Sequence, residues 1–322
     1  MFVALFSFLE YNGRDIYGDR LIISLPKKGG IIMLTKEQLH EKINAGVRFL
    51  DGATGSNLQK VGMPRGCCTE EWILAHPQAL TDLQRGYAEA GSQILYAPTF
   101  QAQPIALEKV GLGEQTEAIN EKLALLTREA CPQCLVAGNL TTLATFTDSY
   151  DEEKFDLLVE NYRRQIHGLL SGGVDLLAAE TLMYPLEAEA ILTAAELEGA
   201  GAAFYTFTMQ PDGSLFSGRD AGAVLRELEE AGAAGVGFNC VAADMMTPYL
   251  VSKLRRSVKG PLICKPNAGV PVIGDDKLPH YPMEPDEFAG IVADCVKMGA
   301  TVLGGCCGTD PRFIAALKER LA

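Results

Sequence analysis

The sequence contains no apolar run that approaches the ~20 residues of a membrane-spanning helix, so we do not expect a membrane protein. It also lacks an excess of basic residues: Lys plus Arg number 28 and Asp plus Glu 41, which gives a formal net charge of −13. A chain this acidic, without a basic stripe, is not expected to bind nucleic acid or an anionic membrane surface. No linker rich in Pro, Gly or Ser and no low-complexity segment divides the 322 residues. We therefore expect one main domain.

The amino terminus lacks the features of a secretory signal. Met1–Leu9 is apolar but short, has no basic start and no small-residue cleavage site, and Glu10 follows at once. We expect a cytoplasmic protein with reduced cysteines. Residues 1–33 match nothing that follows, and we interpret them as an extension of unknown role or as an upstream start, with Met33 as the natural beginning. A short strand or a barrel plug is the alternative. Residues 34–322 form the predicted domain.

One pattern occurs eight times along that domain: a short apolar or β-branched run, followed by an amphipathic helical stretch. The runs are Arg48–Asp51, Ile94–Phe100, Leu135–Leu140, Asp175–Thr181, Ala202–Met209, Gly235–Cys240, Leu262–Asn267 and Thr301–Gly305. The helical stretches are Leu80–Ala90, Glu117–Ala130, Phe155–Ser171, Leu186–Glu198, Ala221–Ala231, Met245–Lys253, Pro285–Met298 and Pro311–Leu321. Strands that alternate with helices pair in parallel through right-handed crossovers.

Eight such units are typical of an α/β protein with the (β/α)₈ TIM-barrel fold. A doubly wound open sheet is the alternative, although no Gly-x-Gly-x-x-Gly follows the first run, which disfavours a dinucleotide site. Thr35-Lys36-Glu37-Gln38 has the pattern of a capping box and predicts one more helix before the first strand. We expect this helix to close the bottom of the barrel.

Polar residues and cysteines gather where the predicted strands end. In a TIM barrel the chemistry takes place at the carboxyl ends of the strands. The residues at those ends are Asp51, Thr99, Asn139, Glu180, Thr208, Asn239, Cys240, Asn267, Cys306 and Cys307.

Three of the nine cysteines stand at these ends: Cys240, Cys306 and Cys307. Strands six and eight of a barrel are separated by only one strand, so the three thiols can converge. Three thiolates suit Zn²⁺, and three protein ligands with an open fourth position are typical of a catalytic zinc. From spacing alone, buried apolar cysteines and a vicinal disulfide remain alternatives.

The other cysteines are weaker candidates. Cys131-Pro-Gln-Cys134 has the spacing of a redox motif but precedes a strand. A redox motif begins a helix, whose amino terminus lowers the thiol pKa, so a redox role is disfavoured. Cys67 and Cys68 follow the first strand and can line the mouth of the pocket, whereas Cys264 and Cys295 are expected to be packing residues.

Four sequence blocks together resemble a known family. They are Phe49–Gly55, Gly237–Cys240, Pro266–Pro271 and Gly304–Thr309, the last of which reads Gly-Gly-Cys-Cys-Gly-Thr. These blocks resemble the signature blocks of the homocysteine S-methyltransferases, which include a module of cobalamin-dependent methionine synthase and the enzymes that use betaine or S-methylmethionine. The resemblance extends over about Leu34–Ala322. It implies a zinc-bearing (β/α)₈ barrel with Zn²⁺ on Cys240, Cys306 and Cys307, at the carboxyl ends of the strands.

The resemblance also implies a reaction and a substrate site. The thiol of homocysteine would take the fourth zinc position as a thiolate and accept a methyl group, which gives methionine. Asp51 and Glu180 would bind the substrate ammonium, unless they serve as a helix cap and a salt-bridge partner. Backbone N–H groups of the turn at residues 52–57, which begins at Gly52, would meet the carboxylate. The candidates for orienting these groups are Thr99, Asn139, Asn239 and Asn267.

The methyl donor is less well defined. The betaine enzyme has a Trp and a Tyr where this chain has Cys68 and Gln101, which disfavours betaine. The blocks are most similar to those of the methionine synthase module, but the 322 residues contain no cobalamin-binding Asp-x-His-x-x-Gly. We therefore rank a methyl-corrinoid, methylcobalamin on a partner protein, slightly above a sulfonium such as S-methylmethionine or S-adenosylmethionine. A thiol-binding zinc subunit of a multi-component corrinoid system is the alternative function. The sequence is compatible with an oligomer.

Overall fold

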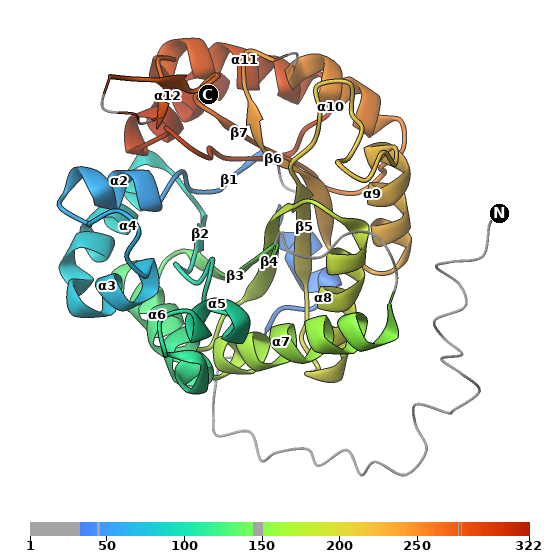
Figure 1. Cartoon of the computed structure of the whole chain (residues 1–322). Helices are drawn as coiled ribbons and strands as arrows, with labels where there is room; N and C mark the ends of the chain where they lie inside the picture. Colours follow the sequence, from blue (N-terminus) through green and yellow to red (C-terminus); the bar gives the residue numbers. More distant parts are fainter. Residues whose placement is uncertain (1–32, 44–45, 144–150, 246, 276, 278) are drawn as a thin grey trace. The chain divides into compact units, whose positions relative to one another are not determined.

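The computed structural model describes residues 33–43, 46–143, 151–245, 247–275, 277 and 279–322. Within them, eight parallel strands form one sheet in the order β1-β10-β7-β6-β5-β4-β3-β2 (Figure 1). The strands are β1 (Arg48–Phe49), β2 (Ile94–Tyr96), β3 (Leu135–Thr141), β4 (Leu176–Leu182), β5 (Ala203–Phe207), β6 (Gly235–Ala242), β7 (Leu262–Asn267) and β10 (Val302–Leu303). Each strand overlaps its predicted run and extends at most two residues beyond it.

The two ends of this strand order meet. A parallel bridge joins Leu50 to Ile94, and the N–H of Gln93 donates to the carbonyl of Phe49 at 2.8 Å. The sheet is therefore a nearly closed barrel. The predicted (β/α)₈ fold is confirmed, and the alternative of an open doubly wound sheet is wrong.

A helix follows each strand and lies outside the barrel, as predicted (Figure 1). In chain order these helices are α4 (Pro77–Ala90), α6 (Thr116–Ala130), α7 (Glu152–Ser171), α8 (Pro185–Leu197), α9 (Ala221–Glu230), α10 (Thr247–Arg255), α11 (Pro285–Lys297) and α12 (Pro311–Leu321). No described helix is long and apolar enough to pass through a lipid bilayer.

Several short elements were not predicted. They are α2 (Gly55–Lys60), α3 (Thr69–Ala75), α5 (Pro104–Glu108), the 3₁₀ turn η2 (Gly113–Gln115) and the antiparallel pair β8 (Val272–Ile273) and β9 (Pro279–His280). Pieces of this length depend on tertiary contacts more than on a periodic pattern, because isolated helices of one or two turns are not stable.

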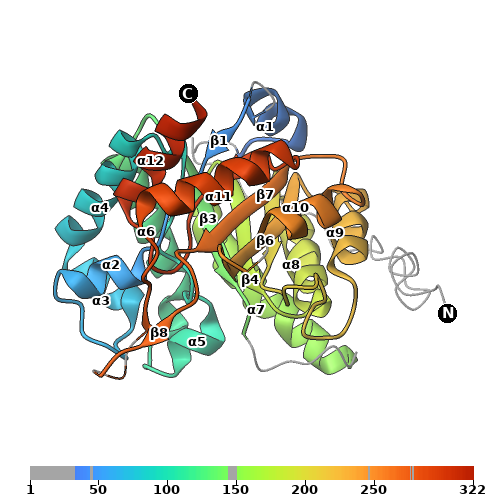
Figure 2. The ribbon, with the colours of Figure 1, turned by 90° about the horizontal axis from the view of Figure 1, so that it is seen from above.

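The capping box is present at the start of α1 (Lys36–Ile43). The backbone N–H of Thr35 donates to Gln38 Oε1 at 2.9 Å, and the N–H of Gln38 donates to Thr35 Oγ1 at 3.2 Å. Leu39 and Ile43 are buried in one cluster with apolar residues from the starts of the strands, and each contributes about 1.5–3 kcal/mol by burial. Figure 2 shows α1 at the end of the barrel opposite β8 and α5. As predicted, α1 closes the bottom.

The predicted extension, residues 1–33, lies outside the described residues except for Met33. At the next position, the N–H of Leu34 donates to the carbonyl of Asp175 at 2.9 Å, and the carbonyl of Leu34 accepts the N–H of Ala202 at 2.8 Å. The chain is thus tied to the barrel from Leu34 onward. A boundary at residue 33 stays a prediction.

Candidate functional site

The three predicted thiols converge at the mouth of the barrel. Cys240 lies on β6, and Cys306 and Cys307 follow β10. The Sγ of Cys240 is 3.0 Å from that of Cys306 and 3.9 Å from that of Cys307, and all three sulfurs lie within 4.8 Å of one another. Sulfur ligands of a tetrahedral zinc are about 3.8 Å apart, from a Zn–S length of ~2.3 Å. The trio therefore fits a soft divalent metal ion after small side-chain adjustments.

The end of β7 orients the Cys306–Cys307 pair. The N–H of Cys306 donates to the carbonyl of Pro266 at 2.7 Å, and the N–H of Cys307 donates to Asn267 Oδ1 at 3.1 Å. In return, the carbonyl of Cys307 accepts the N–H of Ala268 at 3.0 Å. The vicinal cysteines are therefore held by a neighbouring strand and not by their own loop alone.

A β-bulge sets the position of Cys240. The register of β6 against β7 shifts between Asn239 and Ala242, and Cys240 has φ 57°. A second bulge in β4 gives Thr181 φ 59°. Non-glycine residues in this region cost about 1–3 kcal/mol and concentrate at functional sites. Asn239 joins the two bulges, because it accepts the Thr181 N–H at 2.7 Å and donates to Thr181 Oγ1 at 2.7 Å.

Within the protein alone, the thiol cluster favours negative charge on one sulfur. Hydrogen bonds from Cys240 and Cys306 lower the pKa of Cys307 well below its usual range. The hydrogen bonds that Cys240 makes to Cys306 and Cys307, together with burial, raise the pKa of Cys240 far above its usual range. Three thiolates this close repel one another, so a cation is needed to hold all three deprotonated.

Beside the thiols lies a buried cluster of two carboxylates and one lysine. The side chains of Asp51, Glu180 and Lys265 are 3%, 9% and 4% exposed. Lys265 Nζ is 3.0 Å from Glu180 Oε2 and 3.8 Å from Asp51 Oδ1. Asn139 donates to Glu180 Oε1 at 2.9 Å, and Asn239 donates to Glu180 Oε2 at 3.4 Å. Asn239 Nδ2 also lies 3.8 Å from Cys306 Sγ, which connects the carboxylates to the thiols.

Burial and charge shift the pKa values of this cluster. Burial raises the pKa of Asp51 to about 7, although Lys265 and the backbone N–H of Tyr96 oppose the shift. That N–H donates to Asp51 Oδ2 at 2.8 Å. Burial alone would lower the pKa of Lys265, but Glu180 and Asp51 hold it well above its usual range. Lys265 is thus a fixed cation, while Asp51 titrates near neutrality.

The turn that begins at Gly52 is held tightly. A Cβ on Gly52 would lie 2.6 Å from both Thr309 Oγ1 and the Tyr87 hydroxyl. Thr309 Oγ1 accepts the N–H of Ala53 at 3.2 Å, so this amide of the predicted carboxylate-binding turn already has a partner. Asn57 Nδ2 donates to the carbonyls of Ala53 and Thr309 at 2.7 and 2.8 Å.

Of the predicted orienting residues, Thr99 stands apart. It is fully buried, its hydroxyl donates to the carbonyl of Asn139 at 2.8 Å, and the same oxygen accepts the Asn139 N–H at 3.1 Å. Thr99 therefore fixes the ends of β2 and β3 to each other and reaches the carboxylates only through Asn139.

The remaining cysteines are not part of the thiol cluster. Cys131 and Cys134 are buried in a cluster with Tyr87, Leu95 and Ile314. Burial raises the pKa of both thiols, that of Cys134 to about 11, which is unfavourable for redox chemistry. Cys264 and Cys295 are fully buried, as expected of packing residues. Cys67 and Cys68 are half-buried and pack against the apolar cluster under α3 and α4.

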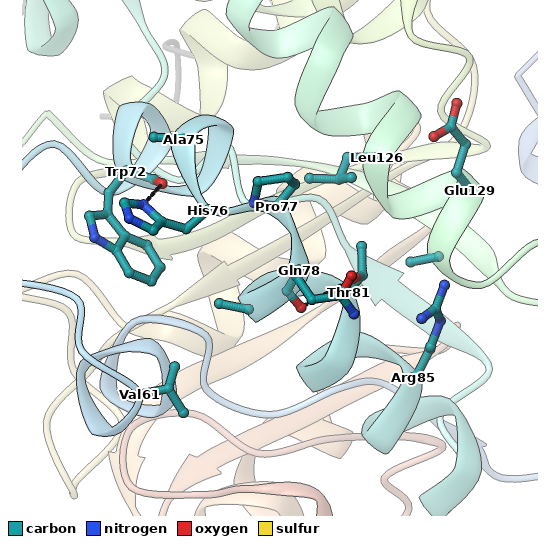
Figure 3. Close-up of a pocket in the computed structure, with 12 residues that line it drawn as sticks. Val61, Trp72, Ala75, His76, Pro77, Gln78, Thr81, Arg85, Leu126 and Glu129 are labelled. Carbon is teal, nitrogen blue, oxygen red and sulfur yellow. Dashed lines mark hydrogen bonds between the residues drawn. The ribbon is translucent and has the colours of Figure 1, made fainter.

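A cavity of about 580 Å³ lies between the outer helices α3, α4 and α6 (Figure 3). It is lined by Trp72, His76, Arg85 and Glu129 among others, and the Trp72 and His76 rings stack with their centroids 4.3 Å apart. None of the strand-end residues described above lines it. We therefore base no function on this cavity.

Sequence reasoning missed two contributors to the site. Lys265 follows three apolar residues of β7, and a charged residue inside a fully buried strand is a signal that could have revealed it. Tyr281, just after β9, hydrogen-bonds to Cys307, and burial raises its pKa. Nothing in the sequence indicates that the β8–β9 segment returns to the thiols.

The fold and the thiol cluster define a (β/α)₈ barrel protein with a candidate catalytic metal centre at its mouth. The chain belongs to the homocysteine S-methyltransferase family, because the family model described as Homocysteine S-methyltransferase matches residues 48–321. The resemblance noted in the sequence is thereby confirmed.

Two relatives and one solved structure are similar to this chain. It is 30% identical over 301 residues to the homocysteine S-methyltransferase of Escherichia coli (strain K12), which covers 85% of this chain and 95% of the relative. It is 26% identical over 305 residues to the methionine synthase of Mycobacterium leprae (strain TN), which covers 89% of this chain but 25% of the relative. The chain thus spans about a quarter of that synthase. The metallated crystal structure of the homocysteine methyltransferase MmuM from Escherichia coli has a TM-score of 0.74 and 26% identity, covering 85% of this chain and 96% of that one.

Proposed function

We propose that this chain is a zinc-dependent homocysteine S-methyltransferase, which transfers a methyl group to the homocysteine thiol and forms methionine. One observation carries the proposal: three thiols meet within 4.8 Å at the mouth of the barrel, next to the buried carboxylates Asp51 and Glu180. A site for an acceptor sulfur thus adjoins a site for an ammonium group. Membership of the family supports this substrate.

In this proposal Cys240, Cys306 and Cys307 are the zinc ligands. A zinc ion bound there would keep the acceptor sulfur in its thiolate form, the nucleophilic one, and hold it in position. Asn267 orients Cys307 through its backbone N–H. All three cysteines must be reduced to bind zinc, which agrees with the expected cytoplasmic location.

The amino-acid end of homocysteine is assigned to the acidic residues. Asp51 and Glu180 provide negative charge for the ammonium, and Asn139 and Asn239 hold Glu180 in place. Thr99 acts at a distance, by fixing Asn139. Gly52 lets the turn at residues 52–57 lie close to Thr309, and amides of this turn other than those of Ala53 and Asn57 are the candidates for the substrate carboxylate.

For the donor we propose a methyl-corrinoid on a separate protein or, as the second choice, a sulfonium. In either reaction the thiolate sulfur forms a bond to the methyl carbon, and the donor leaves with the electron pair of the bond that breaks. Betaine remains disfavoured. Cys68 and Gln101 stand where the betaine enzyme has aromatic residues, and both contact Glu70: Cys68 Sγ at 3.6 Å from Oε2 and the Gln101 N–H at 2.8 Å from Oε1.

A second candidate function is that of a homocysteine-binding zinc subunit, active only within a multi-component corrinoid system. The match to a methionine synthase over a quarter of its length favours it, because in that relative the matching region is part of a larger protein.

A donor screen tests both proposals. Zinc-loaded protein would be incubated with homocysteine and a reductant, and with S-methylmethionine, S-adenosylmethionine, betaine or methylcobalamin in turn, with methionine measured by mass spectrometry. Methionine from the purified chain with a sulfonium or free methylcobalamin supports the enzyme. Methionine only after a methyl-corrinoid protein is added supports the subunit. If the zinc-loaded chain does not bind homocysteine in calorimetry, both proposals are wrong.

A further inference from the structure

Lys265 occupies an unusual position for a lysine. It lies on β7 in the barrel interior, with its ammonium 3.0 Å from Glu180 and 4.7 Å from the centre of the Tyr96 ring. Lysine is almost never fully buried without a charged partner. Here the nearer partner is Glu180, and Asp51 Oδ1 lies 3.8 Å from the same ammonium; these are the two carboxylates assigned to the substrate ammonium.

The hydrogen bonds of the two carboxylates differ. Both oxygens of Glu180 are engaged, Oε1 by Asn139 and Oε2 by Lys265 and Asn239. Asp51 Oδ2 accepts the N–H of Tyr96, but Asp51 Oδ1 is buried and has no hydrogen-bond partner among the described residues. A buried acceptor without a partner costs free energy and points to a missing ligand. Of the two carboxylates, Asp51 is therefore the one with an open acceptor, although Asn139 Oδ1, beside Glu180, is also buried without a hydrogen-bond partner among the described residues.

The charges lead to the same conclusion. Two carboxylates and one ammonium leave the ionised cluster with one uncompensated negative charge, which is expensive in a buried site. One further cation balances it. The high pKa of Asp51, caused mainly by burial, agrees with a carboxyl group that lacks its second cation.

We propose that Lys265 is a positioning residue. It forms an ion pair with Glu180 and leaves Asp51 as the direct acceptor of the substrate ammonium. Glu180 then acts through Lys265. Its ion pair holds the Lys265 ammonium 3.8 Å from Asp51 Oδ1, which is too far for a hydrogen bond to that oxygen. This inference rests on the proposed function and refines the shared role given there to Asp51 and Glu180.

The test compares two thiols that differ only in the amino group. Homocysteine and γ-mercaptobutyrate, which is homocysteine without its amino group, would be titrated into the zinc-loaded full chain by calorimetry. The change in the ratio of their Kd values between the unmodified chain and a variant reports the ammonium contact, because any difference between the two thiols themselves is the same in every variant. A charged hydrogen bond predicts a preference for homocysteine of about 10- to 100-fold.

Three variants separate the roles. Asp51→Asn should abolish the preference. Glu180→Gln releases Lys265 to pair with Asp51, so the preference should fall to about that of Asp51→Asn. The double variant Glu180→Gln/Lys265→Met removes the competing ammonium and should regain most of the preference, although it lacks Glu180. It leaves one unpaired buried carboxylate where Lys265→Met alone leaves two, so it is less prone to unfold.

Two results overturn the inference. One is a double variant that is no better than Glu180→Gln, because the lysine is then not the competitor. The other is an Asp51→Asn variant that keeps its preference, because Glu180 then binds the ammonium directly. Failure of both thiols to bind the unmodified chain contradicts the proposed function instead, so the two failures are distinguishable.

Discussion

The sulfur atoms of Cys240 and Cys306 lie 3.0 Å apart, closer than two ligands of one tetrahedral zinc at about 3.8 Å. Metal binding should therefore separate the two thiols slightly. Since Cys240 is fixed by its bulge and Cys306 by the carbonyl of Pro266, the side chains and not the backbone are expected to adjust.

Cys306→Ser should remove most of the zinc, because a serine hydroxyl is a much poorer zinc ligand than a thiolate near pH 7. The barrel should still fold, since its apolar core does not include Cys306. Zinc per chain and far-ultraviolet circular dichroism measure the two effects. Cys67→Ser is the matched control, because Cys67 is a half-buried thiol away from the cluster and should keep full zinc. Full zinc occupancy in Cys306→Ser would contradict the ligand assignment.

Asn267→Ala removes the acceptor of the Cys307 N–H without touching a thiol. Groups that orient metal ligands typically contribute about 10- to 100-fold in metal affinity, so zinc affinity should fall by that factor. Competition with a chromogenic chelator measures it. Asn139→Ala is the control, because Asn139 bonds to Glu180 and should leave zinc affinity unchanged. Equal affinities in the two variants would show that Asn267 does not support the metal site.

The preference for homocysteine over γ-mercaptobutyrate should depend on pH. Burial raises the pKa of Asp51 to about 7, so the carboxyl group is protonated and neutral below that value and ionised above it. An ammonium stabilises the ionised form, so the preference should be full above pH 8 and should fall about tenfold for each pH unit below 7 until the two thiols bind equally. The charged groups that face Asp51 are Lys265, which opposes its protonation, and Glu180, which favours it.

Calorimetry between pH 5.5 and 8.5, about three units around that pKa, gives the profile. Deprotonation of the thiol affects both ligands alike and cancels in the ratio. Asp51→Asn is the control and should give a flat ratio. A ratio that does not change with pH in the unmodified chain would remove Asp51 as the titrating acceptor.

Much of the fold was predictable because parallel strands inside a barrel are buried on both sides and read as continuous apolar runs. Leu135–Leu140 and Leu262–Asn267 are examples, and both are strands in the structure. The convergence of Cys240 with Cys306 followed from topology alone, since the carboxyl ends of all barrel strands lie at the same end and only β7 separates β6 from β10. The predicted runs at Arg48–Asp51 and Thr301–Gly305 were longer than the two-residue strands β1 and β10.

What the sequence could not predict depends on contacts between distant segments. Lys265 is stable in the core only because Glu180, from another strand, meets its ammonium. The left-handed backbone at Thr181 is held by the side chain of Asn239, and no local signal predicts that a β-branched residue will adopt it. Such features are fixed by tertiary hydrogen bonds and not by periodicity.

Cys131→Ser should leave methyl transfer nearly unchanged. The side chain is fully buried against α4 and α12, and burial raises the pKa of its thiol, so it is not a nucleophile at neutral pH. The substitution should lower stability by only about 1 kcal/mol. Initial rates normalised to bound zinc measure its effect on activity. A large loss of rate at unchanged zinc content would support the redox role that the Cys131–Cys134 spacing suggested.

Gly52→Ala should destabilise the chain although it adds a single methyl group. The new Cβ would lie 2.6 Å from both Thr309 Oγ1 and the Tyr87 hydroxyl, which are held in place by their own hydrogen bonds. Overpacking of this kind costs about 1–3 kcal/mol, which corresponds to a decrease in Tm of about 2 to 10 °C. Gly55→Ala is the matched control, because nothing lies within 4 Å of its Cβ position and an alanine at the start of α2 should leave Tm unchanged or slightly higher. Differential scanning fluorimetry compares the two variants. Equal Tm values would mean that the turn at Gly52 can move, and the close contact with Thr309 would then not be what positions it beside Asp51.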